Sequence, residues 1–526
     1  MTGGGGQQPP PSVRNAGKRT LSGMSWGLSA DLVTVVVQVG HAAVMARLLI
    51  PADFGLVALA MAFLRFGAFM SQLGLGHALV QKEALSDRAV RTAFTTSVVL
   101  GLGLSILFSQ LAVFVDGVTE TPEAVPVTQA LAWLMFVSAL GTTSRSLLKR
   151  ALRFRTQAMI SVGTYVVGYV VVGISLAAAG FGVWSLVFAA LAQTALGSAT
   201  VMLIVRHSLR PLVDLHELRA LYGYGARFSA LQLLAAVQHA VILGVISRFA
   251  GATAVGLYDR AHLLVVLPFE KVQASATGVL FPIISRSQSD VARLRTAYLG
   301  HSALVTAVAL PTLAGMGASA GPLVAVLLGD QWNLVPAIVP IVAVGVAFGL
   351  LAHMARVVCD GLALLGPRLR IDAAQLLLTA AILFLVRDTG VAGMAAAVAA
   401  GQAFQYALYT RLLLRRLEID PISYVRTIAP GTVAALLVAL VLAGVLRLGS
   451  HVGFDAAGPS LALQMVLGAI TLIALLRSPL FASQRSTLGR RLLAALGTGT
   501  SSRVARRLIV FTFGIAETDQ SGVSEL

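Results

Sequence analysis

Four charged side chains fall inside stretches of the sequence that are otherwise apolar: Asp31, Arg65, Glu270 and Lys271. A charge in lipid is costly, so such a residue usually faces a partner or a water-filled cavity. Arg65 lies near the middle of its stretch, where it could bind an anionic group of a substrate or pair with Asp31 to fix helix packing. Glu270 and Lys271 are adjacent and therefore about 100° apart on a helix, so only one can point down a cavity, and we favour Glu270.

Polar residues near the ends of these stretches complete the set of candidates. Arg47 and Arg248 stand at equivalent places in two related halves of the chain, where each could bridge the halves or bind a head-group region. With Arg65 and Lys271 they are the predicted substrate-binding residues. His239 occupies a place comparable to that of His41, as a packed, hydrogen-bonded residue or as a proton carrier. Glu270, Asp31 and His239 are the predicted ion-coupling residues.

Patterns of enzymatic chemistry are missing from the sequence. It has no G-x-x-x-x-G-K-[ST] phosphate loop, which excludes ATP-driven transport within this chain, and no H-E-x-x-H pattern. The nine histidines are scattered, and the single cysteine, Cys359, excludes a disulfide framework within one chain. We therefore expect no catalytic residue, no metal, no cofactor and no enzymatic activity.

The composition is that of a membrane protein that crosses the bilayer many times. The chain has 526 residues, of which 57% are hydrophobic and 12% charged, whereas a soluble domain carries roughly a quarter charged residues. A spanning helix needs about 20 mostly apolar residues, a length that predicts an all-α protein with fourteen spans. The predicted spans are 24–46, 54–79, 93–115, 124–147, 158–178, 181–205, 228–247, 255–282, 298–320, 334–355, 371–387, 391–413, 427–447 and 459–476.

The distribution of basic residues predicts the orientation of the chain. Most arginines and lysines, including Arg145, Arg356 and Arg368, fall in or beside the loops that follow even-numbered spans, whereas Arg260 is counted with the sparsely basic intervening loops. Cytoplasmic loops of membrane proteins are enriched in Lys and Arg, so both termini are expected in the cytoplasm. The net charge of +17 then indicates contact with anionic inner-leaflet lipids rather than with nucleic acid.

The sequence also predicts a tandem duplication of about 200 residues, a pattern found in transporters. Arg47, Gly55 and Leu56 match Arg248, Gly256 and Leu257 with identical spacing. The expected organisation is a disordered cytoplasmic tail (1–20), an N-terminal lobe (21–205), an amphipathic linker (206–227), a C-terminal lobe (228–413), two extra spans (414–476) and a basic cytoplasmic tail (477–526).

A resemblance to a known family rests on six segments: ARLLIPADFGLVALA, LGLGHALVQKE, LLKRALRFRTQAMIS, GFGVWSLV, SRFAGATAVGLYDRAHLLVVLP and LFPIISRSQSD. Together they resemble Wzx-type oligosaccharide flippases, the polysaccharide-exporter branch of the multidrug/oligosaccharidyl-lipid/polysaccharide flippases. The resemblance implies two six-helix lobes around a central cavity in a bacterial plasma membrane. It also implies that an undecaprenyl-diphosphate-linked oligosaccharide is moved to the outer leaflet by alternating access, driven by an ion gradient.

Two positions depart from that family's pattern, and two other functions stay open. Ile242 stands near a place where the family often has an aspartate, and Arg65 stands in a helix that is usually uncharged. One alternative is a drug or metabolite exporter of the same superfamily, which would favour acidic cavity residues. The other, a membrane glycosyltransferase or ligase, would need catalytic residues on a large outer loop. The expected partners are the lipid-linked substrate and polysaccharide polymerase or export machinery.

Overall fold

The computed structural model describes residues 34–72, 85–217, 226–286, 290–451 and 456–485, apart from residue 483, together with residues 79, 288, 489 and 512. These residues form helices joined by short turns, and no strand occurs among them, so the predicted all-α class is confirmed. The N-terminal tail, Asp31 and most of the C-terminal tail lie outside the described residues.

Helices occupy most of the described chain. In the first half they are an unlabelled helix (Thr34–Leu48), α2 (Pro51–Gln72), α4 (Asp87–Leu111), α5 (Val113–Thr119), α6 (Ala124–Arg150), α7 (Phe154–Tyr165), η1 (Val166–Gly173), α8 (Ile174–Ala178) and α9 (Val183–Ile204). In the second half they are α11 (Ala226–Arg286), α12 (Val291–Leu304), η2 (Val305–Ala309), α13 (Leu310–Ala318), α14 (Ala320–Leu327), η3 (Asp330–Trp332), α15 (Val335–Gly361), α16 (Leu365–Leu385), α17 (Gly390–Arg416), α18 (Pro421–His451), α19 (Ala457–Arg477) and η4 (Pro479–Phe481).

Every predicted span falls at least partly on one of these helices, and α11 contains two of them. Within the described residues, ten helical stretches are long and apolar enough to cross a membrane. The helix Thr34–Leu48 is shorter, and α16 carries three charges in its first eight residues. The protein is therefore a multi-pass membrane protein, and the count of fourteen spans stays a prediction.

Local sequence explains where several of these helices begin. Ser86 precedes α4 and its hydroxyl accepts a hydrogen bond from the amide of Ala89 at 3.0 Å, which satisfies a donor of the first turn. Asp290 precedes α12, and its carboxylate accepts a hydrogen bond from the amide of Arg293 at 2.9 Å. Gly251 divides α11, because its backbone has a φ of 81°, a value that favours glycine.

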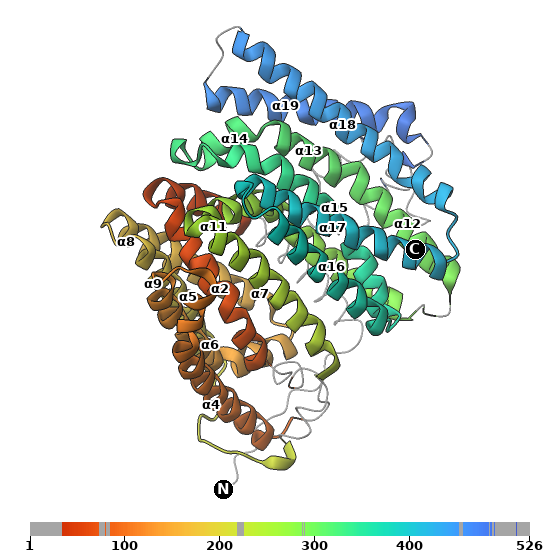
Figure 1. Cartoon of the computed structure of the whole chain (residues 1–526). Helices are drawn as coiled ribbons and strands as arrows, with labels where there is room; N and C mark the ends of the chain where they lie inside the picture. Colours follow the sequence, from red (N-terminus) through yellow and green to blue (C-terminus); the bar gives the residue numbers. More distant parts are fainter. Residues whose placement is uncertain are drawn as a thin grey trace.

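Two groups of helices lie on either side of one central pair (Figure 1). Helices α4 to α9 form the N-terminal group, and α12 to α17 form the C-terminal group. Between them α2 packs along α11. Helices α18 and α19 pack on the outer side of the C-terminal group, against α13 and α14. The central pair is thus the place where the two groups meet.

The backbone of the two halves is similar at the turns on either side of α6 and α15. Helices α6 and α15 are each 27 residues long, and each is followed by a residue with positive φ, Leu152 at 53° and Ala363 at 54°. Glu120 before α6 and Gly329 before α15 also have positive φ, at 50° and 98°. Corresponding turns in the two halves are therefore built in the same way.

The start of the predicted linker is extended rather than helical. Residues 206–214 form no helix, and their backbone binds the face of α4: the amide of Leu212 donates to the Thr95 hydroxyl at 3.0 Å, and that of Asp214 donates to the Thr92 hydroxyl at 3.2 Å. Arg91 also donates to the Arg210 carbonyl at 3.1 Å. This part of the linker is fixed to the N-terminal group by hydrogen bonds.

Candidate functional site

The first feature of the candidate site is a close crossing of α2 over α11. A methyl group on Gly55 would overlap the carbonyl oxygen of Ala252, and one on Gly256 would overlap the carbonyl oxygen of Pro51. Backbones can approach this closely only where both helices carry a residue without a side chain. The repeat thus places one glycine from each half at the crossing, which we call the closed end of the molecule.

A tryptophan from the C-terminal group packs against the N-terminal half at this closed end and is hydrogen-bonded to it. Trp332 is fully buried, its ring centroid is 5.5 Å from that of Phe54, and its indole N–H donates to the Ala46 carbonyl at 2.8 Å. The neighbouring Gln331 amide donates to the carbonyl oxygens of Ala46 and Leu49. A buried apolar cluster with members from both halves surrounds these contacts. The closed end is therefore sealed by packing as well as by hydrogen bonds.

Arg47 and Arg248, the equivalent arginines of the two halves, each contact the other half at the closed end. Arg47, on the first helix, donates through Nη2 to the Val326 carbonyl of α14 at 2.6 Å. Arg248, on α11, forms an ion pair with Glu120, which follows α5. Next to it the hydroxyls of Thr121 and Ser247 are 3.0 Å apart and hydrogen-bonded. Each half thus contributes one arginine that holds the other half.

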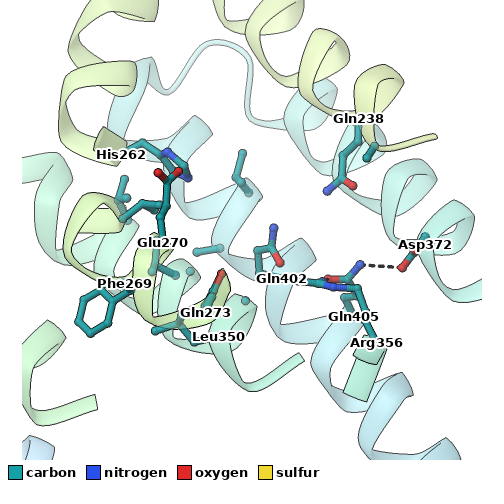
Figure 2. A pocket seen from close by; sticks show the side chains of 18 of the residues that line it. Gln238, His262, Phe269, Glu270, Gln273, Leu350, Arg356, Asp372, Gln402 and Gln405 are labelled. Carbon is teal, nitrogen blue, oxygen red and sulfur yellow. Dashed lines mark hydrogen bonds between the residues drawn. The ribbon is translucent and has the colours of Figure 1, made fainter. Parts of the chain in front are cut away.

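The second feature is a polar cavity of about 400 Å³ between α11 and the C-terminal group, which we call the C-terminal cavity. Its wall comes from α11, α15, α16 and α17, and it contains five glutamines, two arginines and two carboxylates together with an apolar strip. The polar wall residues are Gln232, Gln238, Gln273, Gln402, Gln405, Arg356, Arg368, Glu270, Asp372 and His262. Figure 2 shows Glu270 and Arg356 on opposite sides of this space, with Gln402 between them.

Hydrogen bonds and ion pairs hold one side of the cavity in place. Arg356 donates to the Gln405 carbonyl oxygen at 2.9 Å, and the Gln405 amide donates to Asp372 at 2.9 Å, the bond drawn in Figure 2. Tyr409 also donates to Asp372, at 2.7 Å. Arg368 is paired with Asp360 and lies 3.6 Å from Asp372. Among the described residues, Arg368 is thus held by carboxylates, whereas Arg356 is held by a neutral amide.

The N-terminal group holds its equivalent arginine differently. Arg145 is the twenty-second residue of α6, as Arg356 is of α15. It donates to the carbonyl and hydroxyl oxygens of Ser138 and to the Ser198 hydroxyl. Gly141 leaves the room for its guanidinium, because a methyl group there would lie 2.9 Å from Nη1. The repeat therefore conserves the arginine but gives it serine partners in one half and a glutamine at a cavity wall in the other.

The predicted site residues do not lie together: some line or adjoin the cavity, and others lie at the closed end. Glu270 lines the cavity, as does His262, whereas His239 lies on the same stretch of α11 as the cavity residue Gln238. Arg65 has an exposed side chain on α2 and lies within electrostatic range of His239 and His262. Arg47 and Arg248 lie at the closed end. The side chain of Lys271 and the whole of Asp31 lie outside the described part of the chain. The Arg65–Asp31 pair therefore stays a prediction.

Sequence reasoning assigned four arginines to the wrong setting, and Arg145, which lies within α6, is one of them. Arg356 lies within α15 and Arg368 within α16, and both line the cavity instead of belonging to a basic loop. Arg260 lies within α11, paired with Asp259 and with its guanidinium 4.4 Å from the centroid of the Phe54 ring. The reason is that hydropathy marks a helix by its average, which hides one charge near the end of a long helix.

The glutamines of α17 were missed as well. Gln402 and Gln405 are three residues apart, as are Asp372 and Gln375 on α16, and residues with this spacing share one helix face. Two such faces in neighbouring spans were the available signal. Among the described residues, no group of three or more His, Cys, Asp or Glu could hold a metal ion.

The fold and the cavity define a multi-pass helical membrane protein of duplicated architecture, closed at one end by a crossing of its two halves. The model of the polysaccharide biosynthesis protein family matches residues 44–336. Because this match covers more than half of the 526 residues, the chain belongs to that family.

Named relatives agree with this assignment. The chain is 27% identical over 321 residues to the succinoglycan biosynthesis transport protein ExoT of Rhizobium meliloti (strain 1021). This alignment covers 60% of the present chain and 64% of ExoT. It is 24% identical over 340 residues to the lipopolysaccharide biosynthesis protein WzxC of Escherichia coli (strain K12), covering 64% of this chain and 68% of WzxC. The fold resembles that of the lipid II flippase MurJ in an inward closed conformation, with a TM-score of 0.66, 14% identity and coverage of 89% and 99% of the two chains.

Proposed function

We propose that this protein moves a lipid-linked oligosaccharide, carried on a polyprenyl diphosphate such as undecaprenyl diphosphate, across the plasma membrane for surface polysaccharide synthesis. The observation that carries the proposal is the combination of a closed crossing at one end with a polar, amide-lined cavity inside the bundle. A hydroxyl-rich head group needs hydrogen-bond partners to pass through hydrocarbon, and this cavity supplies them. The relatives' names, which refer to succinoglycan and lipopolysaccharide biosynthesis, support the same substrate class.

The transport cycle we propose alternates between two arrangements of the lobes. In this cycle the closed end faces the outer side of the membrane and both termini lie in the cytoplasm, an orientation that the basic loops support. The substrate enters from the cytoplasmic side, and the lobes then separate at the Gly55–Gly256 crossing. The Arg47 and Arg248 contacts must break at that step and form again on return.

Arg65 is the proposed ligand of the diphosphate outside the C-terminal cavity. Its exposed guanidinium presents a planar set of donors that can bind two phosphate oxygens at once. Glu270 and His239, with Asp31 of the first span, are the proposed coupling residues for an ion gradient. Anionic inner-leaflet lipids and polysaccharide polymerase or export machinery are the proposed partners.

The favoured alternative substrate is a small cationic drug or metabolite. Glu270 in the cavity wall suits such a molecule, but Arg356, whose described partner is the neutral amide of Gln405, lines the same space and opposes a cation. We therefore prefer the anionic, sugar-bearing lipid. A catalytic role gains no support from any residue arrangement described above.

Reconstitution in liposomes tests the proposal. Purified full-length protein and a fluorescent polyprenyl diphosphate carrying one glucose are placed in vesicles, and a membrane-impermeant lectin measures how fast the sugar reaches the outer leaflet. Transfer at least about tenfold faster than in empty vesicles is expected, and Arg65→Gln should remove most of it because charge-assisted hydrogen bonds contribute roughly 1.5–3 kcal/mol. Arg65→Lys should rescue poorly, because a lysine is a point charge without a planar fork.

Transport of a cationic dye in place of the lipid would contradict the proposal. Arg447→Gln is the matched control, since Arg447 lies near the end of α18, outside the central pair. Equal flipping by Arg65→Gln and Arg447→Gln would remove Arg65 from the mechanism while leaving the flippase function intact.

A further inference from the structure

The amides of the C-terminal cavity are arranged for a ligand other than phosphate. Gln238 and Gln273 come from the two halves of α11 and Gln402 comes from α17, and Figure 2 shows the three side chains at the same space. Within the described part of the chain, none of the three has a side-chain hydrogen bond to protein, unlike Gln405, whose amide is held by Arg356, Asp372 and Gln375. Three amides are therefore available to a ligand.

The chemistry of an amide matches that of a sugar hydroxyl. Each glutamine offers two N–H donors and one carbonyl acceptor, and a hydroxyl both donates and accepts. The strip of Val342, Val346 and Leu350 along the wall, with Gly345 and Gly349 between them, supplies an apolar surface for the face of a sugar ring. A cavity of about 400 Å³ lies within the range of roughly 300–1,000 Å³ for small-molecule sites.

The charges of the wall indicate which kind of sugar fits. Two arginines and two carboxylates line the cavity, so their formal charges cancel. Asp372 is already bound to Gln405, Tyr409 and Arg368, whereas Glu270 has no ion-pair partner among the described residues. The Glu270 carboxylate can accept hydrogen bonds from sugar hydroxyls, but it would repel the carboxylate of a uronic acid.

Arg356 marks the end of the cavity that suits a phosphate. It is the cation of the wall whose described partner is a neutral amide, so its charge is not cancelled by a carboxylate in direct contact. Figure 2 places it on the side opposite Glu270. The cavity is therefore polarised, with a cation on one side, a carboxylate on the other and Gln402 between them.

We propose that this cavity is a subsite for one neutral sugar ring, the ring joined to the diphosphate, with Gln238, Gln273, Gln402 and Glu270 binding its hydroxyls and Arg356 binding the adjoining phosphate. The proposal rests on the proposed function and assigns part of the head group to the C-terminal lobe alone. Arg145, the equivalent residue of the other lobe, is occupied by Ser138 and Ser198. In this proposal the C-terminal lobe binds the sugar ring and the adjoining phosphate, and the equivalent arginine of the N-terminal lobe binds neither.

Binding measurements on the purified full-length protein in detergent test the subsite. The probes are three polyprenyl diphosphates, one bare, one carrying glucose and one carrying glucuronate. Wild type should bind the glucose-bearing lipid at least about tenfold more tightly than the bare lipid, since several hydrogen bonds of about 1 kcal/mol are gained. The glucuronate-bearing lipid should bind no more tightly than the bare one.

Variants separate the sugar contribution from the phosphate contribution. The triple change Gln238→Leu, Gln273→Leu and Gln402→Leu should abolish the preference for glucose and leave binding of the bare lipid within about twofold of wild type. Arg356→Gln should weaken the glucose-bearing and bare lipids alike, by about tenfold or more. Gln193→Leu, on α9 in the other lobe, is the matched control and should keep the preference.

Each outcome bears on a different claim. If the triple variant folds, binds the bare lipid and still prefers glucose, the subsite is overturned while the flippase function stands. If glucuronate binds as tightly as glucose, the preference for a neutral sugar is overturned. If wild type binds none of the three lipids, the proposed function itself fails.

Discussion

At Gly55 a single hydrogen atom fills the space between two helices of different halves. Gly256 does the same from the other side, so the crossing needs both residues to be glycine. A methyl group at either position would push the backbones apart, and the contacts of Trp332 and Arg47 lie close to the same joint. Closure at this end is therefore sensitive to the addition of one methyl group at either glycine.

Gly55→Ala is expected to prevent full closure. A cysteine replacing Ala261, which is fully buried near the crossing, should react with an impermeant maleimide in intact cells several times faster when Gly55→Ala is present. Export should fall in parallel, because the outward-facing arrangement can no longer return. Gly103→Ala is the control, since a methyl group there has open space around it. Equal labelling of the two alanine variants would show that the crossing does not seal the protein.

Arg248 and Glu120 form an ion pair that holds the two halves together at the closed end, and both side chains remain partly exposed. A pair of this kind contributes about 0.2–1 kcal/mol, so Arg248→Ala should raise labelling at the Ala261→Cys position only about 1.4- to fivefold. The exchange Arg248→Glu with Glu120→Arg should restore the wild-type rate. Arg295→Ala, which removes an arginine of similar exposure that is paired with Glu418, is the control and should leave labelling unchanged. A double exchange as leaky as the single variant would exclude the ion pair as a latch.

At the scale of elements, α15, α16 and α17 are tied together by one carboxylate, which is 13% exposed. Asp372 of α16 accepts hydrogen bonds from Gln405 and Tyr409 of α17, and Arg368 links it to Asp360 of α15. Such a network costs little when complete, but the loss of one member leaves the others unpaired. The position of Arg356 at the cavity wall depends on this network through Gln405.

Asp372→Leu should therefore destabilise the C-terminal lobe by about 3–5 kcal/mol. Asp372→Asn should cost less, because the amide oxygen still accepts from Tyr409 and from Gln405. The measurement is the thermal midpoint in detergent, followed by fluorescence-detected size-exclusion chromatography after heating. Asp388→Leu removes an exposed aspartate paired with Arg387 and should leave the midpoint unchanged. Equal midpoints for the leucine variants at Asp372 and Asp388 would contradict the role of the network.

For the whole molecule, the predicted orientation puts the closed end outside the cell. In a Cys359→Ala background, single cysteines at Val118 and His451 should react with an impermeant maleimide in intact cells, whereas one at Thr156 should react only after permeabilisation. Val118 is chosen because its side chain is 63% exposed, whereas the neighbouring Thr119 is buried. Labelling of Thr156→Cys in intact cells would reverse the orientation and with it the direction of the proposed transport.

The sequence by itself determined the class of the protein, the position of nearly every helix and the equivalence of Gly55 with Gly256. These properties are local or periodic, because a span is set by its hydrophobic length and a duplication by repeated spacing. The sequence also determined that Glu270 and Lys271 cannot both point into one cavity, because adjacent residues lie about 100° apart on a helix.

Only the tertiary structure decided which polar residues meet. Gln238, Arg356 and Gln402 lie more than a hundred residues apart from first to last, and no spacing rule connects residues on three packed helices. The partner of Arg248 likewise became visible only when the turn at Glu120 was placed against α11. The physical reason is that in a membrane the backbone hydrogen bonds lie within each helix, so sequence specifies the helices while side-chain packing alone selects their neighbours.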